Sequence, residues 1–198
     1  MRESNTENRW LRRFAAGVAV CALLLVIAGG LVTSNDAAMS IPDWPLSYGK
    51  LVPPLEGGIR FEFAHRALAA TVAVLTLVLA VWLARTEPRR WIRSLGWLAV
   101  AAVVAQAVLG GAVVRFVTPK PLAILHACFA QVCFGLLVAV AVALQWRGRP
   151  VFGAGEARLP LLAAAALFAQ TIGDALWRVE HGRLGVGLAC EPLRQQER

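Results

Sequence analysis

Four long stretches of the chain contain no Asp, Glu, Lys or Arg, and they constrain its fold more than any other feature. They cover residues 14–33, 67–84, 95–114 and 121–146 and are 20, 18, 20 and 26 residues long. A helix needs about 20 predominantly apolar residues to cross the hydrocarbon core of a bilayer. The stretches therefore predict four transmembrane helices. The first is too long for a cleaved signal peptide and lacks a small-residue cleavage site, so we expect it to be retained.

A fifth apolar stretch, residues 159–177, is interrupted by Pro160 near its start and Asp174 near its end. The predicted fold class is an all-α membrane protein: a four-helix transmembrane bundle plus a fifth transmembrane helix. Only 16% of the residues are charged, whereas a soluble domain carries about 25%. The expected segments are a basic arm, the four-helix bundle, a loop, and the fifth helix with its tail: 1–13, 14–146, 147–158 and 159–198.

Arginine and lysine are unevenly divided between the two sets of connections. The N-terminal arm and the loops 85–94 and 147–158 hold eleven, whereas 34–66 and 115–120 hold five over a longer combined length. Connections rich in Lys and Arg stay in the cytoplasm. The sequence therefore predicts a cytoplasmic N-terminus. Because the net charge of +8 mostly reflects this asymmetry, we expect membrane lipid, and no nucleic acid, among the partners.

The four cysteines have no spacing typical of a metal site or a disulfide scaffold. Cys128 and Cys133 are five residues apart, so they do not share a helix face, and no CxxC motif occurs. We expect Cys21, Cys128 and Cys133 to be small buried residues, with Cys190 in the tail.

The first outer connection is long and rich in turn-forming residues. It runs from Ser34 to Phe61 and contains Pro42, Trp44, Pro45 and paired prolines and glycines further on. This composition predicts an ordered set of turns. Two interpretations stay open: a plain interfacial hairpin, or a lid over a site that opens outward.

A short motif is repeated in the two outward-going helices. Gly29-Gly30 lies near the end of the first and Gly110-Gly111 near the end of the third. Each is followed by an inward-going helix with a histidine about one turn from its outer end, His65 or His126. The bundle is therefore expected to consist of two helix hairpins of similar design.

His65 and His126 are predicted to lie at similar depth in the membrane, since both helices run inward. Ionisable residues within a membrane are candidates for function, and bundles hold cofactors between side chains of facing helices. A flat cofactor with two axial imidazoles fits this arrangement, and that cofactor is haem. The alternative is that each histidine only hydrogen-bonds a neighbouring helix.

Glu62 precedes His65 by three residues and therefore shares its helix face. A carboxyl group near the membrane boundary resists ionisation, a condition that suits proton transfer. The alternative is an ion pair with Arg66 or Arg60. A di-iron site is not expected, because it needs a second Glu-x-x-His pair and further glutamates.

Several of these motifs, taken in order, resemble the haem A synthase family of cytochrome oxidase assembly. The resemblance covers about residues 14–146. The matching motifs are Gly29-Gly-Leu-Val-Thr-Ser34, Pro42-Asp-Trp-Pro45 with Gly49, Glu62-x-x-His65-Arg66, Gln106-Ala-Val-Leu-Gly-Gly111 and Leu125-His126.

The resemblance implies a membrane oxidoreductase that converts the methyl group of haem O to the formyl group of haem A. It implies His65 and His126 as axial ligands of the haem iron, Arg66 as a further haem-binding residue and Glu62 as the catalytic carboxylate. Haem O would be the substrate and haem A the product, with haem b as another occupant. Haem O synthase and oxidase assembly proteins are the implied partners, and a bacterial-type plasma membrane is the implied location.

The chain also departs from the family pattern. Many members have a second four-helix half that holds haem b, whereas here only residues 170–192 resemble the opening of that half. Some members carry a cysteine pair in the first outer loop, and residues 34–61 contain none. Two copies could associate as a homodimer, or the chain could be a truncated and inactive homologue. A non-catalytic haem-binding assembly factor and an electron-transfer cytochrome are further alternatives. His181 is expected at the surface and not as a ligand.

Overall fold

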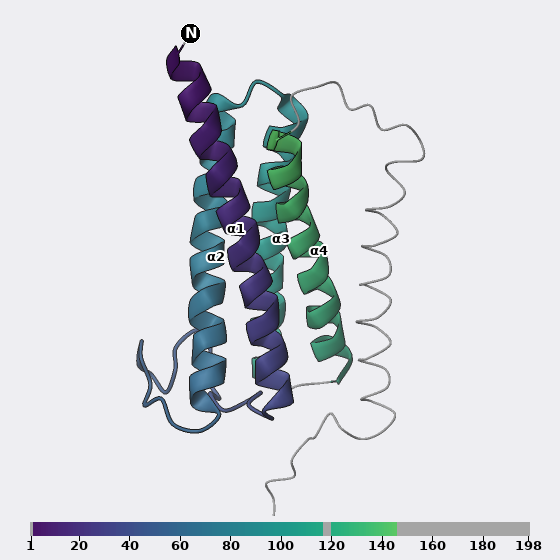
Figure 1. Cartoon of the computed structure of the whole chain (residues 1–198). Helices are drawn as coiled ribbons and strands as arrows, with labels where there is room; N and C mark the ends of the chain where they lie inside the picture. The colour runs from purple at the N-terminus through teal and green to yellow at the C-terminus, as the bar shows by residue number, and fades with distance from the viewer. Residues whose placement is uncertain (1, 117–119, 146–198) are drawn as a thin grey trace, which may run out of the picture.

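The computed structural model describes residues 2–116 and 120–145, which form a bundle of four long helices (Figure 1). These residues contain no β-strand, so the all-α prediction is confirmed for them. The predicted loop 147–158, the fifth helix, His181 and Cys190 lie outside the described residues. The helices are α1 (Arg2–Ser34), α2 (Ile59–Thr86), α3 (Arg90–Arg115) and α4 (Lys120–Gln145).

All four helices are long and apolar enough to cross a membrane. Their candidate spans have 25 to 28 residues and a mean hydropathy between 2.1 and 2.6. The outer surface of the bundle is also apolar, as a lipid-facing surface must be, whereas a soluble bundle would carry polar side chains there. The chain is a multi-pass membrane protein. Large apolar side chains at least half exposed on this surface include Leu24, Ile27, Val74, Val104 and Val108.

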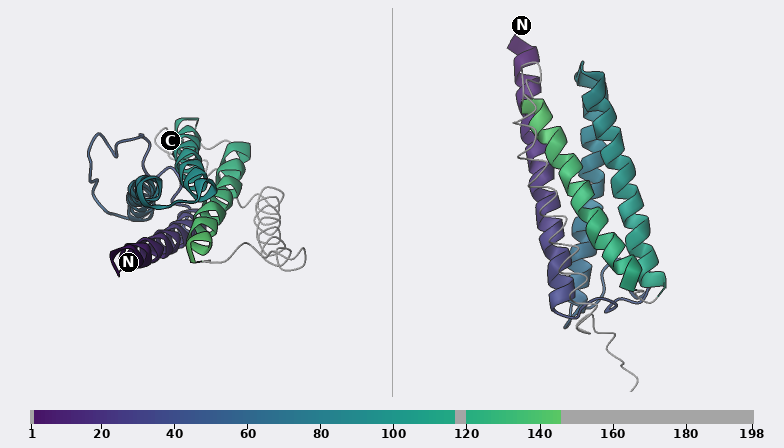
Figure 2. Two further views of the ribbon diagram at one scale, coloured as in Figure 1. Left: turned by 90° about the horizontal axis from the view of Figure 1, so that it is seen from above. Right: turned by 90° about the vertical axis from the view of Figure 1, so that its right-hand side faces the viewer.

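The bundle is square, with consecutive helices side by side and antiparallel. Helix α1 packs against α2 and α4, and α3 packs against the same two helices. Consequently α2 and α4 lie on a diagonal of the square, as the view from above shows (Figure 2). A group held between α2 and α4 would lie on the bundle axis.

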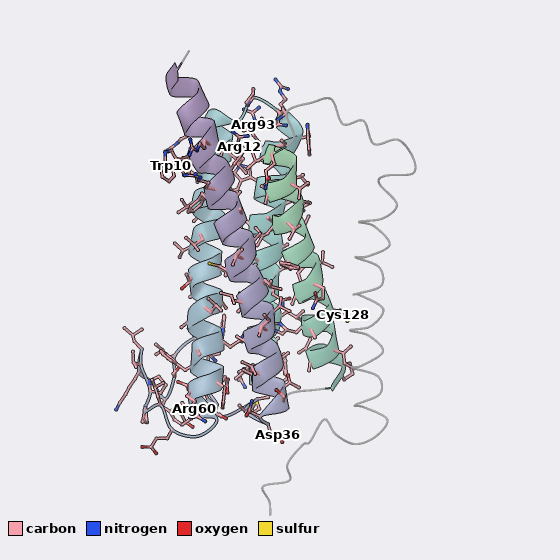
Figure 3. All side chains as sticks on the ribbon, in the orientation of Figure 1. Trp10, Arg12, Asp36, Arg60, Arg93 and Cys128 are labelled. Carbon is pink, nitrogen blue, oxygen red and sulfur yellow. The ribbon has the colours of Figure 1, made fainter. Side chains whose placement is uncertain are left out.

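The two ends of the bundle carry different side chains, which is relevant to orientation. Trp10, Arg12 and Arg93 lie at one end, and Asp36 and Arg60 lie at the other (Figure 3). The basic segment that the sequence predicts as an arm is helical, because α1 begins at Arg2.

At the Arg93 end, a short connection joins α2 to α3 and also contacts α4. Glu87 precedes Pro88 and is extended (φ −91°, ψ 120°), the conformation that a following proline favours. Its buried carboxylate pairs with Arg89 (Nε to Oε1, 2.7 Å), and Arg89 Nη1 donates to the Ala143 carbonyl of α4 at 3.1 Å. Burial raises the pKa of Glu87, but the hydrogen bonds from the Arg89 side chain and backbone outweigh it, so this pKa lies below its usual value.

Candidate functional site

His65 and His126 occupy equivalent positions in the two hairpins. His65 is the seventh residue of α2, which begins at Ile59, and His126 is the seventh residue of α4, which begins at Lys120. Gly29 and Gly110 each lie five residues before the end of their helices, α1 and α3. The repeat seen in the sequence is thus a structural repeat with matching register.

Each histidine ring lies against one of these glycines. A Cβ atom added at Gly29 would be 3.2 Å from His65 Cε1, and one added at Gly110 would be 2.9 Å from His126 Cε1. Glycine therefore makes room for the edge of an imidazole at both places. The second glycines of the two pairs differ in their surroundings. A Cβ atom at Gly30 would meet nothing within 4 Å, whereas one at Gly111 would meet the Trp44 side chain.

The two imidazoles have unsatisfied polar atoms inside the bundle. Nδ1 of His65 and Nδ1 of His126 are both buried, and neither has a hydrogen-bond partner. His65 and His126 belong to α2 and α4, the diagonal helices of the bundle. Buried polar groups are normally paired. Two imidazoles that each have an unpaired Nδ1 and each lie against a glycine fit a site that binds a planar group between two nitrogen ligands.

A third polar side chain, Gln106 of α3, completes this cluster. Its Nε2 donates to the main-chain oxygen of His126 at 2.9 Å and lies 3.4 Å from His126 Nε2. Its Oε1 is buried without a partner. In the sequence, Gln106 is distinguished only by its place in a motif, four residues before Gly110.

Glu62 and Arg66 are directed toward the first outer loop. Glu62 is 5% exposed, and its Oε1 accepts from Arg66 Nη2 at 2.6 Å while its Oε2 accepts from the Ile41 amide at 2.9 Å. The ion pair with Arg66 is the alternative that the sequence left open for Glu62. Both carboxylate oxygens are therefore engaged in this structure.

The Arg66 guanidinium holds the backbone of the loop. Nη1 donates to the carbonyl oxygens of Asp43 (2.7 Å) and Leu46 (3.2 Å), and Nη2 donates to that of Ile41 (3.0 Å). Three loop carbonyls and one carboxylate thus surround a single arginine. These contacts anchor the loop to α2, and haem binding by Arg66 stays a prediction.

Residues 43–50 fold into a tight turn around the Asp43 carboxylate. Tyr48 (φ +53°) and Gly49 (φ +68°) form the two-residue turn between Ser47 and Lys50, whose backbones are paired. Asp43 accepts from the amides of Tyr48 and Gly49 at 2.7 and 2.8 Å. The hydrogen bonds from Gly49 and then Tyr48 lower the pKa of Asp43 below 3.8. The predicted ordered turns are confirmed.

Trp44 connects this loop to the second hairpin. A Cβ atom at Gly111 of α3 would lie 2.8 Å from Trp44 Cδ2 and Cε2, so the indole ring rests on the glycine backbone. The loop therefore starts from α1, is anchored on α2 by Arg66 and reaches α3. This contact, which no local motif predicted, favours the lid over the plain hairpin.

The three cysteines among the described residues form no second candidate site. Cys21, Cys128 and Cys133 are unpaired; Cys128 and Cys133 are buried, and Cys21 is partly buried. Within residues 2–116 and 120–145, no group of three metal-ligating side chains occurs. The prediction of small buried cysteines is confirmed for Cys128 and Cys133.

One family model matches most of the described part of the chain. It is the model of the family described as cytochrome oxidase assembly protein, and it matches residues 12–63 and 59–138. These ranges include both histidines, both glycine pairs and the whole first outer loop. No solved structure matches the chain.

Curated relatives with the name Heme A synthase are also similar to this chain. The protein of Lysinibacillus sphaericus is 36% identical over 53% of this chain and 35% of its own length. That of Symbiobacterium thermophilum is 32% identical over 72% of this chain and 47% of its own, and that of a Chelativorans species is 31% identical over 78% and 43%. The matched region thus spans half or less of each of these relatives.

Proposed function

Because the chain belongs to the cytochrome oxidase assembly protein family, we propose that it is a haem A synthase-type membrane oxidoreductase. Its substrate would be haem O, whose methyl group it converts to the formyl group of haem A for cytochrome oxidase biogenesis. The relatives named Heme A synthase support this proposal. The chain spans less than half of the length of each of these relatives.

The observation that carries the proposal is the matched pair of histidines. His65 and His126 come from diagonal helices at the same register, and each has a glycine cradle and an unpartnered Nδ1. These residues would hold the haem iron. When bound, the haem would supply the iron chemistry.

Glu62 would move protons at the outer edge of the site. It lies one helical turn from His65 on the same face, but Arg66 and the Ile41 amide hold both its oxygens. Each oxygen already accepts one hydrogen bond, so opening of the contact to Ile41 or Arg66 would ease proton exchange at Glu62. This ties its proposed catalytic role to movement of the loop.

The arrangement also suggests how the chain lies in the membrane and what it meets there. A cytoplasmic N-terminus places the first outer loop and the two histidines near the outer face of a bacterial-type plasma membrane. Haem O synthase, oxidase assembly proteins or a second copy of the chain are the proposed partners. Haem b is an alternative occupant of the histidine pair.

A second candidate function, a non-catalytic haem-binding assembly factor, is favoured by one observation. Glu62 binds Arg66 and the Ile41 amide, contacts that suit a carboxylate whose role is to hold the loop. A module of this kind would bind haem through the same pair of imidazoles without altering it.

Haem extraction separates the two candidates. The chain is expressed with a supply of haem O and purified in detergent, and its haems are extracted and separated by chromatography. Haem A or its hydroxylated precursor would support the oxidoreductase. Haem O or haem B alone would favour the binding module, and a preparation without haem would contradict both.

A further inference from the structure

Gln106 breaks the symmetry of the two hairpins. It lies four residues before Gly110, whereas Leu25 lies four residues before Gly29 in the matching position of the first hairpin. One histidine therefore has an amide beside it, and the matching place at the other has an aliphatic side chain. A polar side chain in the middle of a membrane helix is energetically unfavourable, so such residues usually have a function.

The contacts of Gln106 determine which way its amide is oriented. The nitrogen must be the atom that faces the His126 carbonyl at 2.9 Å, because two carbonyl oxygens cannot hydrogen-bond to each other. Oε1 is then directed elsewhere, and it is buried without a donor. A buried acceptor without a donor is unfavourable, because the atom has lost its hydrogen bonds to water.

No described side chain supplies that donor. The neighbouring polar atoms that are also unpaired, Nδ1 of His65 and Nδ1 of His126, make no hydrogen bond to Gln106. A donor that arrives with the ligand would satisfy the oxygen. The ligand of the proposed function has such a group, since haem O carries a hydroxyethyl-type substituent with one hydroxyl where protohaem carries a vinyl group.

We propose that Gln106 Oε1 accepts a hydrogen bond from this hydroxyl group and makes the site selective for hydroxyl-bearing haems. The inference rests on the proposed function, because it assumes that haem occupies the space between His65 and His126. A site built to hydrogen-bond a hydroxyl discriminates against an analogue that lacks it, since its own polar atom is then left unpaired.

Binding of two matched haems tests this subsite without requiring turnover. Haematohaem carries hydroxyethyl groups where mesohaem carries ethyl groups, and neither has an isoprenoid tail to dominate affinity. Both are titrated by absorbance into the haem-depleted full chain in detergent. The quantity compared is the ratio of their dissociation constants in the unaltered protein and in Gln106→Leu. Gln131→Leu, the same change on α4, is the control.

We expect Gln106→Leu to shift this ratio by about tenfold toward mesohaem, the effect of one buried hydrogen bond. Gln131→Leu should leave it unchanged. An unchanged ratio in Gln106→Leu would overturn the proposal. If Gln106→Leu does not fold, Gln106→Asn is used instead. Its side chain is shorter by one methylene group, so the ratio should shift in the same direction. An unchanged ratio in Gln106→Asn would also overturn the proposal.

Failure of the subsite and failure of the proposed function give different results. Haem A formed from haem O by a protein whose ratio is insensitive to Gln106 would refute only the subsite. A ratio that depends on Gln106 in a protein that makes no haem A would support the subsite and refute catalysis.

Discussion

At the scale of single residues, two glycines determine where the candidate ligands lie. Gly29 and Gly110 have no side chain, so the imidazole rings of His65 and His126 can rest against the backbones of α1 and α3. The contact at Gly110 is the closer of the two. Small residues commonly permit such close approach between membrane helices.

Replacing Gly110 with alanine should lower haem binding more than the same change at Gly29. The new methyl group would come 2.9 Å from His126 Cε1, inside normal contact distance, whereas at Gly29 the separation is 3.2 Å. We expect several-fold less bound haem in Gly110→Ala, measured as haem per protein after purification. Gly30→Ala, whose methyl group meets nothing within 4 Å, is the control. Equal haem content in all three variants would contradict the cradle.

Replacing Glu62 with glutamine tests its proposed role in proton transfer. Loss of a general acid or base typically costs 10²–10⁴-fold in rate, so haem A formation should fall by about that factor while bound haem O is retained. The measurement is haem A formed per bound haem O. If the Glu62→Gln variant instead loses haem, and its first outer loop becomes sensitive to protease, the role of Glu62 is to hold the loop through Ile41 and Arg66. That result would contradict the role in proton transfer.

At the scale of elements, the first outer loop is an ordered segment that contacts three helices. It continues α1, its carbonyls are bound by Arg66 of α2, and Trp44 lies on Gly111 of α3. Its turn depends on the Asp43 carboxylate, which receives two amide hydrogen bonds. The loop therefore joins the two hairpins at the end where the histidines lie.

The order of this turn should depend on pH in the acid range. The folded pKa of Asp43 is depressed below its unfolded value of 3.8. The stabilisation is therefore fully present above pH 3.8 and is lost as the pH falls through the lower folded value. Hydrogen exchange at Tyr48 and Gly49, corrected for intrinsic rates, should accelerate at low pH in the unaltered chain. In Asp43→Asn it should be fast and nearly independent of pH; identical profiles would contradict the role of Asp43.

At the scale of the whole molecule, the bundle has one basic end and one end that carries the loop. Arginines gather at the end opposite the loop, in α1 and in the connection between α2 and α3, where Arg89 binds both Glu87 and the Ala143 carbonyl of α4. The histidines and the loop lie near the opposite end. The distribution of charge therefore predicts a single orientation.

Cysteine labelling in intact cells can test this orientation. After replacement of the native cysteines by alanine, a cysteine at Leu51, which is 84% exposed, should react with a membrane-impermeant maleimide. A cysteine at Thr86 should react only after the membrane is permeabilised. The reverse pattern would place the loop in the cytoplasm and refute the proposed topology.

The sequence by itself determined the membrane helices, their number in the described region and the equivalent helix positions of the two histidines. These properties depend on hydropathy and on spacing along a regular helix, which are local. The Glu62–Arg66 ion pair could also be anticipated, because residues four apart are neighbours on a helix.

Only the tertiary structure decided the surroundings of these residues. Three contacts join segments far apart in the chain: His65 with Gly29, His126 with Gly110, and Trp44 with Gly111. The unpaired oxygen of Gln106 likewise depends on which segments surround it. Such contacts depend on how the helices are rotated and offset against one another. Hydropathy leaves both undetermined, because lipid-facing and core-facing positions in a membrane helix are equally apolar.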